Sequence, residues 1–92
     1  TGSWGQFAIS TPDYSYEIDK SVSSTSAASG FINPLTITGF ITKYRNMPVK
    51  GGIIQTAAAS ALGRMLNKRC QTLGIPLLNI VRKEEQAEIL RQ

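Results

Sequence analysis

The chain has 92 residues and a mass of 10.0 kDa; 41% of the residues are hydrophobic and 17% are charged, so the composition permits a folded core and is not that of a disordered chain. Ten Lys and Arg against six Asp and Glu give a net charge of +4, and nine of the ten bases fall within residues 43–92. A basic half of this kind is typical of chains that bind a polyanion or a phosphate-bearing cofactor.

Missing residue types exclude several kinds of site. The sequence has no His, so the chain alone cannot build a Ser–His or Cys–His catalytic pair. Cys70 is the single cysteine, which excludes an intrachain disulfide and argues against a typical protein zinc site. No apolar run approaches the roughly 18 residues of a membrane span. These features favour a reducing, intracellular compartment.

The N-terminal third predicts two short strands and a linker. Residues 4–10 and 14–18 alternate in side-chain type and are rich in aromatic and branched residues, with a turn signal at Thr11-Pro12-Asp13 between them. The Ser-rich stretch 21–29 has the composition of a flexible linker. The chain starts at Thr1 without an initiator Met and stops inside an expected helix, so we interpret it as an internal piece of a longer protein.

A helix is expected after the linker, with Asn33 as its N-cap and Pro34 at its first position. It should end at Arg45-Asn46-Met47-Pro48, and Gly39 weakens the helical pattern within it. The residues expected to share one face of this helix are Leu35, Thr38 or Gly39, and Thr42.

The strongest pattern in the chain is a strand–helix–strand unit. Residues 52–56 and 77–81 are short apolar runs with the composition of strands, and a helix is expected from Ser60 to Leu73 between them, with Gly74-Ile75-Pro76 as its stop. A unit of this length should be parallel and right-handed. A last helix should open at Arg82-Lys83-Glu84-Glu85.

The helix of this unit has a clear apolar stripe of 3.6-residue period. Its members are Leu62, Met65, Leu66, Cys70 and Leu73, and the residues expected to face away are Arg64, Asn67, Lys68 and Gln71. Cys70 is therefore interpreted as a core residue rather than a reactive thiol. The bases of this helix lack interleaved aromatic residues, so we expect a solvated face and no nucleic-acid partner.

The turn before this helix, Ala58-Ala59-Ser60-Ala61-Leu62-Gly63, stands where dinucleotide-binding folds place G-x-G-x-x-G. Ala58 and Ser60 replace the first two glycines, and Gly63 retains the third. Small residues let a pyrophosphate approach the backbone, Ser60 is suited to cap the helix, and the helix N-terminus supplies free N–H groups. Tight helix–strand packing through Ala and Gly is the alternative explanation.

Arg82 and Lys83 follow the second strand, where an acidic residue commonly binds the ribose 2′-hydroxyl of NAD. A cationic pair at this place suits a 2′-phosphate and hence NADP. The alternative is a solvated helix start, although bases near a helix N-terminus are mildly unfavourable.

The order of these pieces resembles the medium-chain dehydrogenase/reductase superfamily. Residues 2–8 are similar to a segment late in its GroES-like domain, and Ala27-Ala28 with residues 31–36 to its A-A…N-P-L-T helix. Residues 53–63 resemble its nucleotide-binding turn, and residues 79–82 its N-V-V-R strand end. Within the superfamily the chain looks most like the mitochondrial 2-enoyl thioester reductases, with the quinone oxidoreductases second.

This resemblance implies an α/β fold: a partial Rossmann-type nucleotide-binding domain, its first βαβ unit, preceded by short strands from the end of a GroES-like domain. Residues 1–30 would be the end of that substrate domain. Residues 31–92 would be the crossing helix and the first half of the NADP-binding domain. The implied activity is zinc-independent, NADPH-dependent reduction of the conjugated C=C bond of a 2-enoyl thioester, in fatty acid metabolism and in the mitochondrion.

The resemblance also implies a set of cofactor contacts. Those near the nicotinamide are Asn33 and Thr36, those at the pyrophosphate are Ala59, Ser60, Ala61 and Leu62, and those at the 2′-phosphate are Arg82 and Lys83. The catalytic tyrosine of the family lies upstream of this chain, so we assign no catalytic residue. The acceptor would be an acyl thioester or a quinone, and we expect a homo-oligomer or a larger assembly. A non-catalytic Rossmann-like interaction module is the rival hypothesis, because the glycine turn is degenerate.

Overall fold

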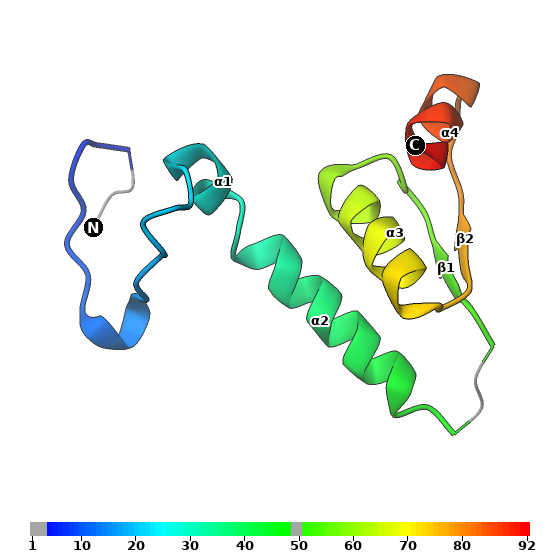
Figure 1. Cartoon of the computed structure of the whole chain (residues 1–92), viewed down its shortest axis with the longest axis horizontal. Helices are drawn as coiled ribbons and strands as arrows, with labels where there is room; N and C mark the ends of the chain where they lie inside the picture. The colour runs from blue at the N-terminus through cyan, green and yellow to red at the C-terminus, as the bar shows by residue number, and fades with distance from the viewer. Residues whose placement is uncertain (1–3, 49–50) are drawn as a thin grey trace.

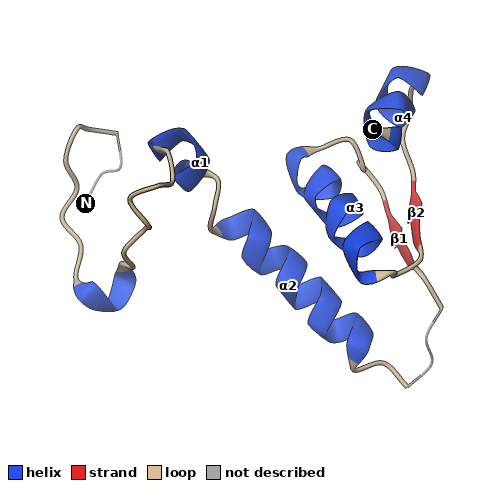
Figure 2. Ribbon diagram, in the orientation of Figure 1, coloured by secondary structure: helices blue, strands red, loops and turns tan. Residues whose placement is uncertain are grey.

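The structure is a computed structural model that describes residues 4–48 and 51–92 (Figure 1). Helices and strands alternate only in its C-terminal half (Figure 2). In chain order the elements are the 3₁₀ turn η1 (Pro12–Tyr14), helices α1 (Ser24–Ala28) and α2 (Ile32–Arg45), strand β1 (Ile53–Gln55), helix α3 (Ala61–Leu73), strand β2 (Leu77–Asn79) and helix α4 (Glu84–Arg91). The described chain is thus a mixed α/β fragment with a two-stranded parallel sheet.

No strand occurs within residues 4–30, so the prediction of two short strands there is wrong. The side chains of Trp4, Phe7 and Ile9 are almost fully exposed, and an alternating segment without a partner gains little from an extended pairing. The turn at Thr11-Pro12-Asp13 is confirmed, because the Tyr14 N–H donates to the Thr11 carbonyl. Gly2 and Ser3, which begin the segment similar to a GroES-like domain, lie outside the described residues.

The Ser-rich stretch forms helix α1 instead of a flexible linker. The Ser23 hydroxyl oxygen accepts a hydrogen bond from the Ser26 N–H at 3.2 Å, which caps the helix at its start. No residue of α1 is buried, so its stability rests on this local cap.

Helix α2 begins two residues earlier than expected. Phe31 is its N-cap, so the prediction that Asn33 caps the helix is wrong; Pro34 lies in the first turn, where no intrahelical acceptor is required. The buried face carries Ile37 and Ile41 instead of the expected face that includes Leu35. The reason is tertiary: these two isoleucines, one turn apart, pack against α3.

The strand–helix–strand unit is confirmed as parallel. Ile53 pairs with Leu77 and Gln55 with Asn79, and both strands are shorter than the apolar runs predicted for them. Helix α3 lies between α2 and the sheet (Figure 1). On the sheet, Ile54 and Leu78 are 67% and 59% exposed, so one face of the sheet is uncovered in this chain.

The core forms where α2 meets α3. Ile37, Ile41, Leu66 and Cys70 are buried together. Partly buried residues packed against them are Ile53, Leu62, Met65, Leu73, Ile75 and Leu77. The predicted apolar stripe of α3 is therefore confirmed, and Leu66 at 2% exposure contributes roughly 1.5–3 kcal/mol by burial.

Both predicted ends of α3 are also confirmed. Ser60 is the N-cap, and its hydroxyl oxygen accepts from the Gly63 N–H at 3.1 Å. Gly74 has φ 66°, the left-handed conformation that favours glycine, and the Ile75 N–H donates to the Cys70 carbonyl at 2.9 Å. These local signals set where the helix begins and where it ends.

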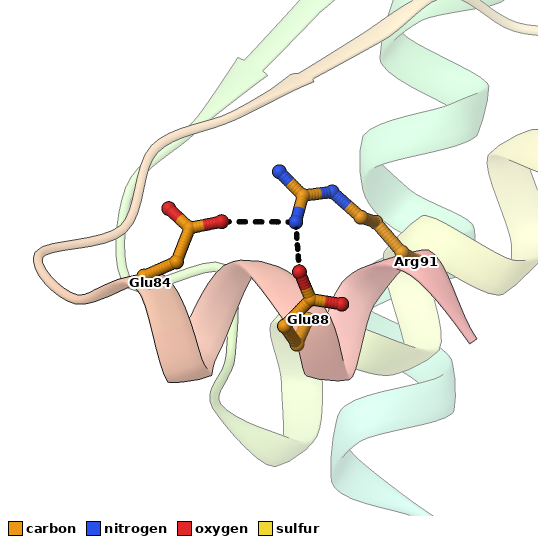
Figure 3. Close-up of polar contacts among 3 residues, drawn as sticks. All are labelled: Glu84, Glu88 and Arg91. Carbon is orange, nitrogen blue, oxygen red and sulfur yellow. Dashed lines mark hydrogen bonds and ion pairs between the residues drawn. The ribbon is translucent and has the colours of Figure 1, made fainter.

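Helix α4 begins at Glu84, with Lys83 as its N-cap, slightly later than predicted. Arg91 reaches back along the helix, and its Nη1 contacts carboxylate oxygens of both Glu84, at 2.9 Å, and Glu88 (Figure 3). The hydrogen bond with Glu84, and then the charge of Glu88, raise the pKa of Arg91. These groups are exposed, so the pairs add little stability.

Candidate functional site

A pocket of about 560 Å³ lies where both strands end and the two following helices begin. The carboxyl ends of parallel strands meet at one edge of a sheet, which brings the β1–α3 turn beside the β2–α4 loop. The residues that line the pocket are Thr56, Ala57, Ala59, Ser60, Ile80, Val81, Arg82 and Gln86. Sequence reasoning identified Ala59, Ser60 and Arg82, and the structure brings these three together.

The β1–α3 turn is tightly held. Ala57 has φ 51°, a left-handed conformation that is costly for a residue with a Cβ. The Ser60 N–H donates to the Ala57 carbonyl at 3.0 Å, and Ala58 is fully buried beneath the turn. Backbone strain of this kind, held by its surroundings, is frequent at binding sites.

Gly63 is required at its position by close packing. A Cβ added there would lie 2.4 Å from the carbonyl oxygen of Ala58, which no side chain can tolerate without a backbone shift. Ala58, one of the replacements for a motif glycine, thus supports the start of α3 from below. The tight packing through Ala and Gly, given above as the alternative explanation of this turn, is therefore present, and it brings the first turn of α3 close to the strand end.

The N-terminus of α3 begins at the pocket, because its N-cap Ser60 is a lining residue. Ser60 caps the helix through its hydroxyl oxygen, as predicted. The backbone N–H groups of Ala61 and Leu62 belong to the first helical turn, where an α-helix provides no internal acceptor and its dipole favours an anion. Their side chains lie elsewhere: that of Ala61 lines a groove between α3 and α4, and that of Leu62 packs against the core.

Arg82 is the cation of the pocket. Its backbone N–H donates to Oε1 of Gln86 at 3.1 Å, which ties the loop to the first turn of α4. Lys83 is exposed at the N-cap of α4 and does not line the pocket. None of the ion pairs among residues 4–48 and 51–92 includes Arg82, and Glu84 is paired with Arg91 (Figure 3).

Asn33 and Thr36 are not brought to this pocket. Both lie in the first half of α2 and are half-buried, and the Thr36 hydroxyl donates to the Ile32 carbonyl at 2.9 Å. Helix α2 packs on α3 through Ile37 and Ile41, so these two residues stay a prediction for the nicotinamide end of a cofactor.

A chain of side-chain amides, which sequence reasoning missed, links both strands to α3 and α4. Nε2 of Gln55 donates to the Gly63 carbonyl at 3.0 Å and to Oδ1 of Asn79 at 2.6 Å. Nδ2 of Asn79 donates to Oδ1 of Asn67 at 2.8 Å, and Nδ2 of Asn67 donates to the Leu90 carbonyl at 3.1 Å. The sequence feature that could have indicated this chain is the polar residue at the end of each otherwise apolar strand, Gln55 in β1 and Asn79 in β2.

The amide chain corrects one prediction. Asn67 was expected to face away from the core, but it is half-buried and bonded to both β2 and α4. The helical wheel misplaces it because α4 covers this side of α3, and the apolar pattern of α3 alone does not reveal that neighbour.

Further observations limit the chemistry that the described residues can perform. Burial raises the pKa of the Cys70 thiol, which is 1% exposed. Within residues 4–48 and 51–92, no cluster of three or more His, Cys, Asp or Glu side chains could hold a metal ion, and no helix is both long and apolar enough to cross a membrane.

The fold and the pocket thus define a parallel strand–helix–strand unit. At the carboxyl ends of its strands lie the N-terminus of α3 and the cation Arg82.

No protein-family model matches the chain. Among curated proteins, it is 33% identical over 88 residues to a Caenorhabditis elegans protein named mitochondrial enoyl-[acyl-carrier-protein] reductase, covering 96% of this chain and 25% of that protein.

Two other relatives have the same name. A second Caenorhabditis elegans protein is 27% identical, with 97% of this chain and 26% of that protein covered, and an Arabidopsis thaliana protein is 23% identical, with 100% and 24% covered. The chain thus spans about a quarter of the length of the curated relatives it matches. This similarity agrees with the resemblance to mitochondrial 2-enoyl thioester reductases.

Proposed function

We propose that the chain is part of a reductase that uses NADPH to reduce the conjugated C=C bond of 2-enoyl thioesters. The observation that carries the proposal is the similarity to relatives named mitochondrial enoyl-[acyl-carrier-protein] reductase, which extends over nearly the whole chain. In this proposal the β1–α3–β2 unit is the first part of a Rossmann-type nucleotide-binding domain, and residues 1–30 belong to a preceding substrate domain.

The pocket residues fit an NADP phosphate. Gly63, which has no room for a Cβ, lets the first turn of α3 sit close to the strand end, so the N–H groups of Ala61 and Leu62 are available to a pyrophosphate. Ala59 and Ser60 are small enough to leave space above them. Arg82 supplies the charge for a 2′-phosphate, with Lys83 as an outer, more exposed cation.

In this assignment the chain's own residues bind and orient, and the bound cofactor would supply the hydride. Asn33 and Thr36 are proposed for the nicotinamide end of the cofactor. The proposal includes no zinc, a mitochondrial location like that in the names of the relatives, and assembly with further protein. The uncovered Ile54 and Leu78 of the sheet support such an assembly, because parallel sheets are normally covered on both faces.

The test uses the full natural chain that carries these 92 residues. NADPH and NADH binding are titrated by cofactor fluorescence, and NADPH oxidation is then followed with a trans-2-enoyl thioester, its saturated analogue and a quinone. We expect NADPH-dependent turnover of the enoyl thioester alone. Turnover of the quinone alone would replace the proposal by a quinone oxidoreductase, and failure to bind either cofactor would replace it by a non-catalytic interaction module.

A further inference from the structure

The amide chain described above joins four elements through one residue of α3. Asn67 accepts from Asn79 of β2 at 2.8 Å and donates to the carbonyl of Leu90, at the C-terminal end of α4, at 3.1 Å. It therefore uses both ends of its carboxamide, one toward the sheet and one toward α4. Asn79 in turn is bonded to Gln55 of β1.

An apolar side chain would serve packing alone equally well at this position. Asn67 is half-buried in the groove between α3 and α4, which Met65 and Leu90 also line, and an amide there avoids a desolvation cost where its polar atoms find partners. The two hydrogen bonds of the Asn67 amide are directional: they favour one register of α4 against α3, since sliding α4 by a residue would leave Nδ2 of Asn67 without the Leu90 carbonyl.

The position of α4 matters to the pocket through the loop that precedes it. The loop is held to the sheet at one end, where the Ile80 N–H donates to the Gln55 carbonyl at 2.9 Å. At the other end the Arg82 N–H donates to Gln86 of α4, which itself lines the pocket. The loop that contains Arg82 is thus bonded to the sheet at one end and to α4 at the other. The position of Arg82 therefore depends on the position of α4.

We propose that Asn67 is a positioning residue for the pocket cation: by holding the Leu90 carbonyl and Asn79 together, it sets the place of α4 and, through the bond from the Arg82 N–H to Gln86, the place of Arg82 in the loop before α4, and so sets the preference for a 2′-phosphorylated nucleotide. The inference rests on the proposed NADPH-dependent function. It assigns to a residue that does not line the pocket an effect on which cofactor the pocket selects.

The test measures dissociation constants for NADPH and NADH in the full natural chain and its variants. Asn67→Leu should weaken NADPH by about fivefold to tenfold and NADH by about twofold or less, because NADH has no 2′-phosphate for a displaced Arg82 to lose. Gln71→Leu, an exposed position on the same helix, is the matched control and should alter neither affinity.

A second pair of variants separates positioning from general loosening. Asn67→Asp keeps the acceptor for Asn79 but loses the donor to Leu90, so it should shift the NADPH-to-NADH ratio in the same direction without a change in side-chain size; it also serves if Asn67→Leu fails to fold. In an Arg82→Ala background, Asn67→Leu should no longer change the ratio, since the residue through which it acts is gone.

The outcomes distinguish the two proposals. Equal losses of affinity for NADPH and NADH in Asn67→Leu, or a ratio shift that persists without Arg82, would overturn the positioning role of Asn67. The proposal that the wild-type protein binds NADPH would still stand. A wild-type protein that binds neither nucleotide would overturn the proposed function and this inference with it.

Discussion

The start of α3 rests on Ala58 so closely that Gly63 cannot carry a side chain. A Cβ at residue 63 would stand 2.4 Å from the Ala58 carbonyl oxygen and 2.8 Å from its Cα, both backbone atoms that cannot move out of the way. One contact between two small residues therefore fixes the height of the helix above the strand end and the shape of the pocket at its N-terminus.

Replacing Gly63 should separate the helix from the turn. Gly63→Ala should lower the free energy of unfolding by about 1–3 kcal/mol through overpacking, and Gly63→Val by more. NADPH affinity should fall as well, because the N–H groups of the first turn move. Gly39→Ala is the control: residue 39 lies inside α2 with nothing within 4 Å of its Cβ position, so helix propensity should stabilise that variant by up to about 1 kcal/mol. Denaturant melts of both variants measure the contrast, and similar effects would contradict the packing argument.

At Ala57, in the strained β1–α3 turn, we expect the opposite of Gly63: a change to glycine should not destabilise the protein. Its φ of 51° suits glycine, so Ala57→Gly should leave stability unchanged or raise it by up to about 1 kcal/mol, despite the extra freedom of glycine in the unfolded chain. Ala61→Gly, at the exposed first position of α3, should instead destabilise by about 0.5–1 kcal/mol. Thermal melts of the two variants test the difference, and a clear loss in Ala57→Gly would show that the left-handed conformation is not retained in solution.

The two basic residues after β2 should differ in effect. Arg82 lines the pocket and Lys83 does not, so Arg82→Ala should weaken NADPH about tenfold or more while Lys83→Ala weakens it about threefold or less. NADH should change little in either variant. The effect of Arg82→Ala should shrink at high salt, since the contact is partly exposed. Fluorescence titration of both nucleotides checks this, and equal losses for NADH and NADPH would reduce Arg82 to a structural residue.

Cys70 should report on unfolding. The thiol is 1% exposed and burial raises its pKa, so the native protein should resist alkylation even at mildly alkaline pH. The native state holds this proton more tightly than the unfolded chain, so the contribution of the thiol to stability is complete at neutral pH and declines as pH rises above about 8.5. Mass spectrometry of the Cys70 peptide should show labelling that rises with the denaturation curve. Rapid labelling without denaturant would mean that the α2–α3 core opens locally.

The parts of the fold that sequence predicts are those with local causes. Helix α3 has its cap at Ser60, its stop at Gly74 and an apolar stripe between them, and all three were visible in the sequence. The pairing of β1 with β2 follows from the length of the segment between them. The strands expected over residues 4–10 and 14–18 do not form, because alternation describes a strand but does not supply its partner.

The sequence predicts only those residues of the candidate site whose place follows from the order of strands and helices along the backbone. Ala59, Ser60 and Arg82 reach one pocket because strand ends and helix starts must meet there. The role of Asn67 was hidden, because it depends on α4 lying against α3, a tertiary contact that no periodicity within either helix encodes. Asn33 was misplaced as a cap for a related reason: Ile37 and Ile41, drawn onto α3, set which residues of α2 turn inward.

The parallel pairing of Gln55 with Asn79 joins residues 24 positions apart, and α3 occupies most of that interval. A helix of 13 residues is marginal alone in water, and two strands of three residues share few hydrogen bonds. Neither α3 nor the β1–β2 pairing is stable enough to persist without the other. Helix formation and closure of the loop between the strands therefore occur in a single cooperative step, in which the conformational entropy of the whole segment is lost at once. A chain break anywhere inside this interval would abolish both.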